Sequence, residues 1–338
     1  MELDDIELAA LASSCPVAEE LSPLVGDGLL MVHGGRYAVP FGGRHATPLG
    51  EWLRGAPAVT ALVGDPGITP PGFDIYLTDV PDPPRPWVHA PAGGVTSAVS
   101  AQPLVSLAAV TLLRASEVLD VWSGLAAESA VYAALLGSAP FRAWRAARPS
   151  RPSPLATEPP VLVHRHDRCL RIVLNRPQVH NAVDTAMRDA LVEALALAVA
   201  DQTVEAVELS GAGPSFSSGG DLEEFGTVGD PATAHAVRLT RHPARWLHEC
   251  AARTVVRVHG AALGAGIELA SFAGTVVATP DAFFGLPEVG MGLVPGAGGT
   301  VGIPRRIGRA RTAWMTVTGA RVDAVTARSW GLVDAVGV

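Results

Sequence analysis

Hydrophobic positions in the second half of the chain recur with the short periods of β-strands. Val161 to His164 and Leu170 to Leu174 flank a polar turn, which predicts two paired strands. Further apolar runs are bounded by glycine, proline or polar residues, and they predict three buried strands: Val204 to Leu209, Thr254 to Val258 and Thr275 to Ala278.

Between these strands the hydrophobic period lengthens to that of a helix. Asp184 is a predicted N-cap for a helix that carries Met187, Leu191 and Leu195 on one face. Gly264 to Phe272 predicts a second helix, which is built largely from small residues. Strands that alternate with helices predict an α/β architecture with mostly parallel strand pairing.

The first 150 residues carry a weaker pattern. Leu29 to His33 and Arg36 to Val39 flank Gly34-Gly35, which predicts a hairpin. Phe73 to Leu77 alternates like a single strand.

The spacing becomes helical from Leu104 to about Ala147, where we expect two helices broken near Gly137 and Pro140. Residues 1–150 are therefore predicted to form a smaller α+β domain of unknown role.

Repeated proline marks a boundary between the two halves. Prolines recur from Arg148 to Pro154 and again at Pro159-Pro160, where they prevent helix and strand and stiffen the chain. We therefore predict a linker at residues 151–160 and a second domain at residues 161–338.

The amino-acid composition excludes some classes of function. Hydrophobic residues make up 48% of the chain and charged residues 17%, so a large buried core is available. A net charge of −8 disfavours a nucleic-acid partner. The sequence contains no lysine, which excludes Schiff-base chemistry and leaves arginine or backbone N–H groups to meet any phosphate.

Other features indicate a soluble cytoplasmic protein without a metal. Cysteines and histidines lack metal-ligand spacing. The acidic start Met1-Glu2-Leu3-Asp4-Asp5 is not that of a signal peptide. Apolar stretches such as Leu104 to Leu113 are too short to span a bilayer, so we expect no membrane association.

Two glycine-rich strand-to-helix junctions carry candidate chemistry. They are Phe216 to Asp221 and His259 to Gly266. A helix N-terminus presents unpaired N–H groups, and small residues let a ligand oxygen approach them. Two such turns that face each other could hold one oxyanion, although each turn taken alone is more often a packing device.

Two glutamates follow these junctions. Glu268 has almost entirely apolar neighbours, and such surroundings raise the pKa of a carboxyl group into a range useful for acid–base catalysis. Glu288 follows a predicted strand in Phe284-Gly285-Leu286-Pro287-Glu288. Glu268 could instead lie on an exposed helix face, and Glu288 could be a loop residue that caps a helix.

Several segments, taken in order, resemble the crotonase (enoyl-CoA hydratase/isomerase) superfamily. The resemblance covers about Val161 to Val338. Its motifs are Asn175-Arg176-Pro177 with Asn181-Ala182, Phe216 to Leu222, His259 to Glu268, Phe284 to Glu288, Pro295 to Thr300, and Gly319 to Gly331.

The resemblance implies a fold of repeated ββα units in a spiral and a homo-oligomer, since the family usually trimerises. It implies an oxyanion hole formed by the amides of Gly220 and Ala265, which would polarise the thioester carbonyl of an acyl-CoA or acyl-carrier substrate. Glu268 and Glu288 match the two carboxylates of the hydratases. The backbone of Ser218 would contact the adenine end of coenzyme A. The implied reaction needs no metal or redox cofactor, and coenzyme A enters only as part of the substrate.

Two departures from the family pattern stand out. The usual run of three glycines is Gly264-Ala265-Gly266 here, and the chain stops at Val338, before the family's C-terminal helices. We expect the helical stretch around Val118 to Leu136 to cover the surface that those helices would cover. Two arginine sets could meet CoA phosphates or could simply be surface residues: Arg142, Arg145 and Arg148, and Arg305, Arg306 and Arg309.

The resemblance favours a hydratase of the lyase class, acting on an acyl-CoA or carrier-bound thioester in fatty acid metabolism or polyketide biosynthesis. Isomerase, thioester hydrolase, decarboxylase or cofactor-free oxygenase activity would use the same oxyanion hole. A non-catalytic thioester-binding protein is the alternative of another class.

Overall fold

A parallel sheet forms the N-terminal end of the molecule in the computed structural model, which describes residues 1–14, 19–34, 49–149 and 158–337. Its strands are paired in sequence order: β1 (Glu2–Leu3), β2 (Leu29–His33), β3 (Val59–Val63), β4 (Ile75–Thr78) and β5 (Val88–His89). Every pairing in this sheet is parallel, so the N-terminal part is α/β, and the prediction of an α+β domain was wrong.

The predicted hairpin has no counterpart in the described part of the chain. Residues 36–39 lie outside the described residues, and β2 pairs with β1 on one edge and β3 on the other. Side chains of β2 alternate between two cores, as a strand buried on both faces requires. Leu30 and Val32 pack with α1 (Asp5–Ser14) and α2 (Leu49–Gly55). Leu29 and Met31 pack on the other face with α3 (Ala92–Ala101), α4 (Pro103–Ser116) and α12 (Arg309–Thr318).

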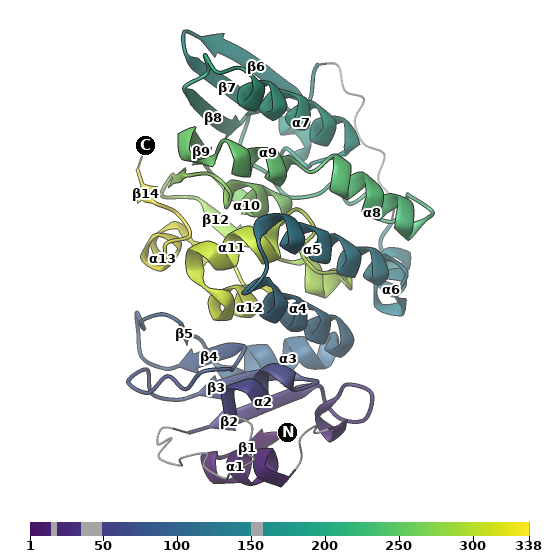
Figure 1. The fold of residues 1–338 in the computed structure, drawn as a ribbon, viewed down its shortest axis with the longest axis vertical. Coiled ribbons are helices and arrows are strands. Elements are labelled where there is room, and N and C mark those ends of the chain that lie inside the picture. The colour runs from purple at the N-terminus through teal and green to yellow at the C-terminus, as the bar shows by residue number, and fades with distance from the viewer. Residues whose placement is uncertain (15–18, 35–48, 150–157, 338) are drawn as a thin grey trace.

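The helices of the N-terminal half lie on both sides of this sheet and beyond it (Figure 1). They are α1 (Asp5–Ser14), α2 (Leu49–Gly55), α3 (Ala92–Ala101), α4 (Pro103–Ser116), α5 (Val121–Leu136) and α6 (Ala139–Ala147), with the short 3-10 helix η1 (Glu19–Leu21). The predicted break near Gly137 and Pro140 is confirmed, because α5 ends at Leu136 and α6 begins at Ala139. The expectation of two helices was wrong, because α4 also ends at Ser116, before α5 begins.

A six-stranded sheet and a three-stranded sheet organise the C-terminal half. The larger sheet contains β6 (Val161–His166), β7 (Cys169–Leu174), β8 (Ala206–Gly211), β9 (Thr254–Val258), β11 (Thr275–Ala278) and β14 (Ala335–Val336). The smaller sheet contains β10 (Ala261–Leu263), β12 (Phe283–Gly285) and β13 (Val322–Asp323). β6 and β7 form the predicted hairpin, and the other pairings in the larger sheet are parallel, as predicted.

The strands of the C-terminal half are connected by helices. They are α7 (Thr185–Ala200), α8 (Pro231–Thr240), α9 (Pro243–Glu249), α10 (Ala265–Ala270), α11 (Gly299–Ile307), α12 (Arg309–Thr318) and α13 (Ala324–Trp330), with 3-10 helices η2 (Pro177–Val179), η3 (Ala251–Arg253) and η4 (Glu288–Met291). Asp184 caps α7, as predicted, by accepting a hydrogen bond of 2.8 Å from the Met187 amide.

The two halves pack directly on each other, although the predicted linker lies largely outside the described residues. Helices α4 and α5 lie against α11 and α12 (Figure 1). Gly124 of α5 approaches Val301 of α11 so closely that an added Cβ would lie 3.0 Å from a Val301 methyl group. The stretch around Val118 to Leu136 therefore covers part of the C-terminal half.

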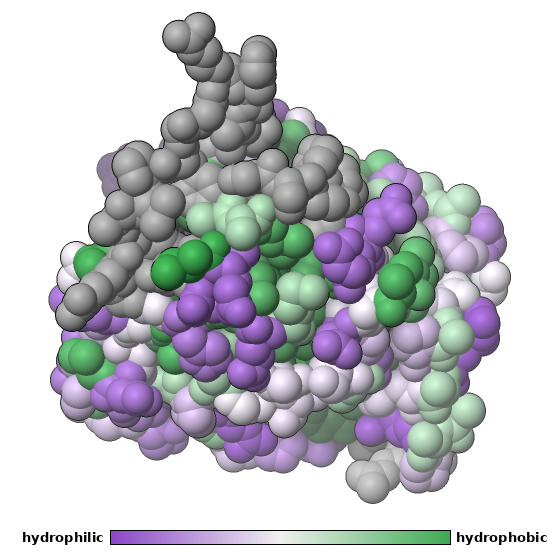
Figure 2. Space-filling model, turned by 90° about the horizontal axis from the view of Figure 1, so that it is seen from below, coloured by the Kyte–Doolittle hydropathy of each residue, from purple (hydrophilic) through white to green (hydrophobic). Residues whose placement is uncertain are grey.

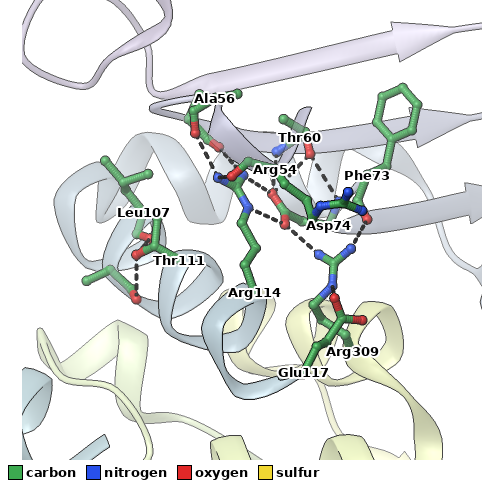
Figure 3. A network of polar contacts seen from close by, with 12 residues as sticks. Arg54, Ala56, Thr60, Phe73, Asp74, Leu107, Thr111, Arg114, Glu117 and Arg309 are labelled. Carbon is green, nitrogen blue, oxygen red and sulfur yellow. Dashed lines mark hydrogen bonds and ion pairs between the residues drawn. The ribbon is translucent and has the colours of Figure 1, made fainter. Parts of the chain in front are cut away.

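A buried polar cluster joins the two halves at the start of β4 (Figure 3). Asp74 is fully buried and accepts hydrogen bonds from Arg114 of α4 and Arg309 of α12. Thr60 of β3 completes the cluster through its amide and hydroxyl, both 3.0 Å from the carboxylate. Each half therefore supplies an arginine to the same carboxylate.

Exposed apolar residues at the N-terminal end are scattered. Seen from that end, hydrophobic residues lie among hydrophilic ones (Figure 2). Among the described residues no single helix is long and apolar enough to cross a membrane, although α3 and α4 pass that test when taken together as a bent pair.

Candidate active site

The first glycine-rich turn is held by a buried asparagine. Asn181 has a left-handed φ of 53° and is fully buried. Its side-chain amide donates to the carbonyls of Ser215 and Phe216 at 2.9 and 3.1 Å, and its side-chain carbonyl accepts from the Arg176 amide. Asn181 therefore fixes the path of the chain into Ser217 to Asp221.

The second turn lies backbone to backbone against the first. Ser217 donates its amide to the Ala261 carbonyl, and its carbonyl accepts from the Leu263 amide, both at 3.0 Å. An added Cβ would lie 2.9 Å from the Leu263 carbonyl oxygen at Gly219 and 2.8 Å from the Ser217 oxygen at Gly266. The glycines are needed because the two turns approach this closely.

Gly220 and Ala265 line one pocket, together with Glu268 and Glu288. Ala265 is the first residue of α10, so its amide has no partner within the helix. Neither amide donates to any other residue that the structure describes. The two amides that the family resemblance assigns to the oxyanion hole are therefore free to bind a ligand oxygen.

Glu268 is a buried carboxyl group in the wall of this pocket, with 2% of its surface exposed. Its Oε2 accepts hydrogen bonds from the amides of Ala297 and Gly299, at 2.7 and 2.9 Å. Burial raises the pKa of Glu268 well above its usual value, and the neighbouring charges of Glu288 and Glu128 raise it further. The reading of Glu268 as a residue on an exposed helix face is excluded.

Glu288 begins η4 and faces the same pocket. Its Oε2 is buried and has no hydrogen-bond partner among the described residues. Burial raises the pKa of Glu288 to about 8. An added Cβ on Gly264 would lie 2.4 Å from Glu288 Oε1, so this carboxyl group lies against the second glycine-rich turn. Two buried carboxyl groups with raised pKa values thus flank the same space.

Ser218 lies apart from this pocket. It is exposed and does not line the pocket walls. Its amide donates to the His180 carbonyl at 2.8 Å and its hydroxyl donates to the Val179 carbonyl at 3.4 Å, so its own carbonyl is the backbone group left for a ligand. Contact with the adenine end of coenzyme A stays a prediction.

The candidate arginine sets differ in their surroundings. Arg306 bonds to the Ser271 and Ala273 carbonyls and to Asp334, and Arg309 bonds to Asp74. This second set is therefore structural. Arg145 of α6 and Arg148, its C-cap residue, lie 3.9 and 3.6 Å from Glu223 carboxylate oxygens and do not line the pocket.

Helix α5 contributes two residues that sequence analysis missed. Tyr132 lines the pocket and lies over Gly296, where an added Cβ would be 2.4 Å from its ring. Glu128 is fully buried and binds the loop that also holds Glu268. Glu128 is the single charged residue in α5, and a lone charge in an apolar helix is a signal for a buried, partnered group.

Metal ligands are not clustered in the described ranges, where no group of three or more His, Cys, Asp or Glu side chains could hold an ion. The pocket can instead offer two free amides, two carboxyl groups and the cations Arg188, Arg238 and Arg241.

Comparison with known proteins places these features in a family. The family model "Enoyl-CoA hydratase/isomerase" matches residues 165–337. The 2,3-dehydroadipyl-CoA hydratase of Escherichia coli is 36% identical over 52% of this chain and 68% of its own length. Solved structures of enoyl-CoA hydratases from Mycobacterium smegmatis and Thermoplasma volcanium are 34% and 30% identical. Each covers 53% of this chain, and the matches span 70% and 72% of those chains with TM-scores of 0.47 and 0.48. Through its C-terminal half, the chain belongs to the enoyl-CoA hydratase/isomerase family, the crotonase superfamily.

Proposed function

We propose that this protein is a hydratase that adds water to an enoyl thioester, borne by coenzyme A or by a carrier protein. The observation that carries the proposal is that Glu268 and Glu288 line the same pocket as the free amides of Gly220 and Ala265. One pocket therefore offers donors for the thioester oxygen and a pair of acid–base groups beside the adjoining carbons.

The amides act on the thioester carbonyl. Attack of water at the β carbon moves an electron pair onto the carbonyl oxygen and creates an enolate. Gly220 and Ala265 donate to that oxygen, and loss of one such donor costs on the order of 10²–10³ in rate at comparable sites. Backbone donors need only small side chains, which accounts for an alanine at position 265.

The carboxyl groups move the protons. One ionised glutamate accepts a proton from the attacking water, and the protonated glutamate delivers a proton to the α carbon, so that the elements of water are added across the double bond. Because burial raises the pKa of both Glu268 and Glu288, the pocket favours one protonated carboxyl group beside one ionised carboxylate. This chemistry uses no metal or redox cofactor.

The pocket also favours an anionic substrate. Arg188, Arg238 and Arg241 line it, in a chain that has no lysine. Guanidinium groups suit phosphates and carboxylates, so coenzyme A or an acidic acyl chain would find a partner here. The similar E. coli protein is named for a dicarboxylic acyl-CoA, which makes such substrates a sensible first choice in an assay.

The test is turnover of a panel of enoyl thioesters, followed by the loss of the conjugated thioester and by product mass. Hydration adds the mass of one water, whereas an isomerase leaves the mass unchanged, and a thioester hydrolase or a decarboxylase splits the substrate. We expect Glu268→Gln and Glu288→Gln to lower kcat by at least about 10². Glu205→Gln, an exposed partner of Arg168, is the control. Full activity in both pocket variants would refute the mechanism.

A further inference from the structure

Glu128 of α5 binds the first turn of α11 with both of its carboxylate oxygens. Oε1 accepts from the Gly298 amide at 2.7 Å, and Oε2 accepts from the Thr300 amide and hydroxyl at 2.9 and 2.6 Å. Two of these three donors are amides, which cannot accept a proton in return. The surroundings of Glu128 therefore suit an ionised carboxylate.

The same turn binds Glu268. Its Oε2 takes the Ala297 and Gly299 amides, so four consecutive amides alternate between the two glutamates. Both carboxyl groups also face the positive end of the α11 dipole. Two acidic groups thus share one helix N-terminus, although they come from opposite halves of the chain.

We propose that Glu128 is a positioning residue of the active site, which fixes this turn against Glu268 and, through its negative charge, holds a proton on the two pocket glutamates. The proposal rests on the proposed function and adds to it, because Glu128 precedes the part of the chain that matches the family model. The N-terminal half would then set the pH at which the catalytic pair works.

The charges around Glu268 are consistent with this role. Glu288 of η4 and Glu128 of α5 raise the pKa of Glu268, and Arg238 of α8 lowers the pKa of Glu128. Burial raises the pKa of Glu128 to about 7, while its hydrogen bonds and Arg238 oppose that rise. Burial lowers the pKa of the neighbouring His242 to about 4, so this histidine is neutral in the working range.

The remaining charged groups of the pocket have partners of their own. Arg188 pairs with Asp189, Arg241 lies 4.0 Å from Glu193, Asp221 pairs with Arg176, and Glu224 accepts from Thr185. They bias the catalytic pair less than Glu128 does, because Glu128 shares the α11 turn with Glu268.

A purely structural role for Glu128 makes a different prediction. A residue that only ties α5 to α11 would change stability when replaced, but it would leave the titration of Glu268 where it was. The titration midpoint of Glu268 therefore separates the two roles.

The experiment is a carbon NMR titration of the full chain, labelled at the glutamate carboxyl carbons. Loss of a resonance in Glu268→Gln assigns Glu268. In Glu128→Gln we expect the Glu268 midpoint to fall by about one pH unit, because a nearby negative charge has been removed. Thr300→Val removes one hydrogen bond and keeps the charge, and Glu51→Gln changes an exposed glutamate of α2; both should leave the midpoint unchanged.

The proposal is overturned if Glu128→Gln leaves the midpoint at its wild-type value, or if Thr300→Val lowers it equally. Should Glu128→Gln fail to fold, the wild-type titration decides, since Glu128 must ionise at a lower pH than Glu268. The pH profile of kcat for hydration should shift to lower pH with the midpoint while KM changes little. Absence of turnover by the wild type would refute the proposed function. The NMR titration would still test whether Glu128 changes the titration midpoint of Glu268.

Discussion

Replacement of Asp74 by asparagine should strongly destabilise the protein. Asp74 has no exposed side-chain surface, and its neighbours Arg114 and Arg309 are 6% and 9% exposed. Its carboxylate accepts two hydrogen bonds from Arg114, at 2.9 and 2.5 Å, and one from Arg309 at 2.7 Å. The cluster therefore places two buried cations on one buried anion.

Asparagine would keep the volume but remove the charge, and its NH₂ group would face arginine donors. Loss of one partner from a buried ion pair costs about 3–5 kcal/mol, because the other charge stays buried without compensation. Arg309 keeps Glu117 at 3.1 Å, and Arg114 keeps carbonyl partners such as Ala58, so we expect the lower end, about 3 kcal/mol.

Urea unfolding, followed by tryptophan fluorescence and circular dichroism, measures this loss. Asp79→Asn is the matched control, since Asp79 is exposed just beyond the end of β4 and should change stability by less than about 0.5 kcal/mol. A loss below about 1 kcal/mol in Asp74→Asn would show that the cluster does not hold the halves together as its geometry indicates.

Three further changes test the pocket. Because burial raises the folded-state pKa of Glu288 from 4.5 to about 8, the wild type should lose stability as pH rises through that window. Glu288→Gln should remove this loss and be more stable than wild type at pH 8 by on the order of a few kcal/mol in urea unfolding; equal stability would contradict it. Gly264→Ala should lower kcat by about tenfold or more, because φ is +46° and the new Cβ would lie 2.4 Å from Glu288 Oε1. Gly93→Ala, with open space around the new Cβ, should not lower it. Tyr132→Ala should raise KM by about tenfold by opening the wall over Gly296, whereas an unchanged KM would show that the ring does not contact substrate.

Much of the C-terminal half could be predicted from local sequence. Short-range periodicity predicts the hairpin of β6 and β7 and the strand Thr254 to Val258. The cap at Asp184 depends on one side chain that accepts a hydrogen bond from a nearby amide. The pocket residues Gly220, Ala265, Glu268 and Glu288 followed from ordered motifs, and the structure brings all four to one cavity.

The N-terminal sheet was harder to predict for a physical reason. Parallel strands are joined by long crossovers, so nothing beside Leu29 to His33 in the sequence indicates its partners at Glu2–Leu3 and Val59–Val63. Gly34-Gly35 suggested a local turn instead. Pairing was decided by burial on both faces of β2, which involves helices from both halves.

The sequence by itself determined the family, the order of the elements in the second half, and the residues of the oxyanion turns and the two glutamates, because each depends on neighbours within a few positions. Only the tertiary structure decided that Glu128 and Tyr132 belong to the same site. Glu128 meets the Thr300 amide across 172 positions. A buried carboxylate must find donors wherever packing supplies them, and no periodicity in the chain records a partner at that distance.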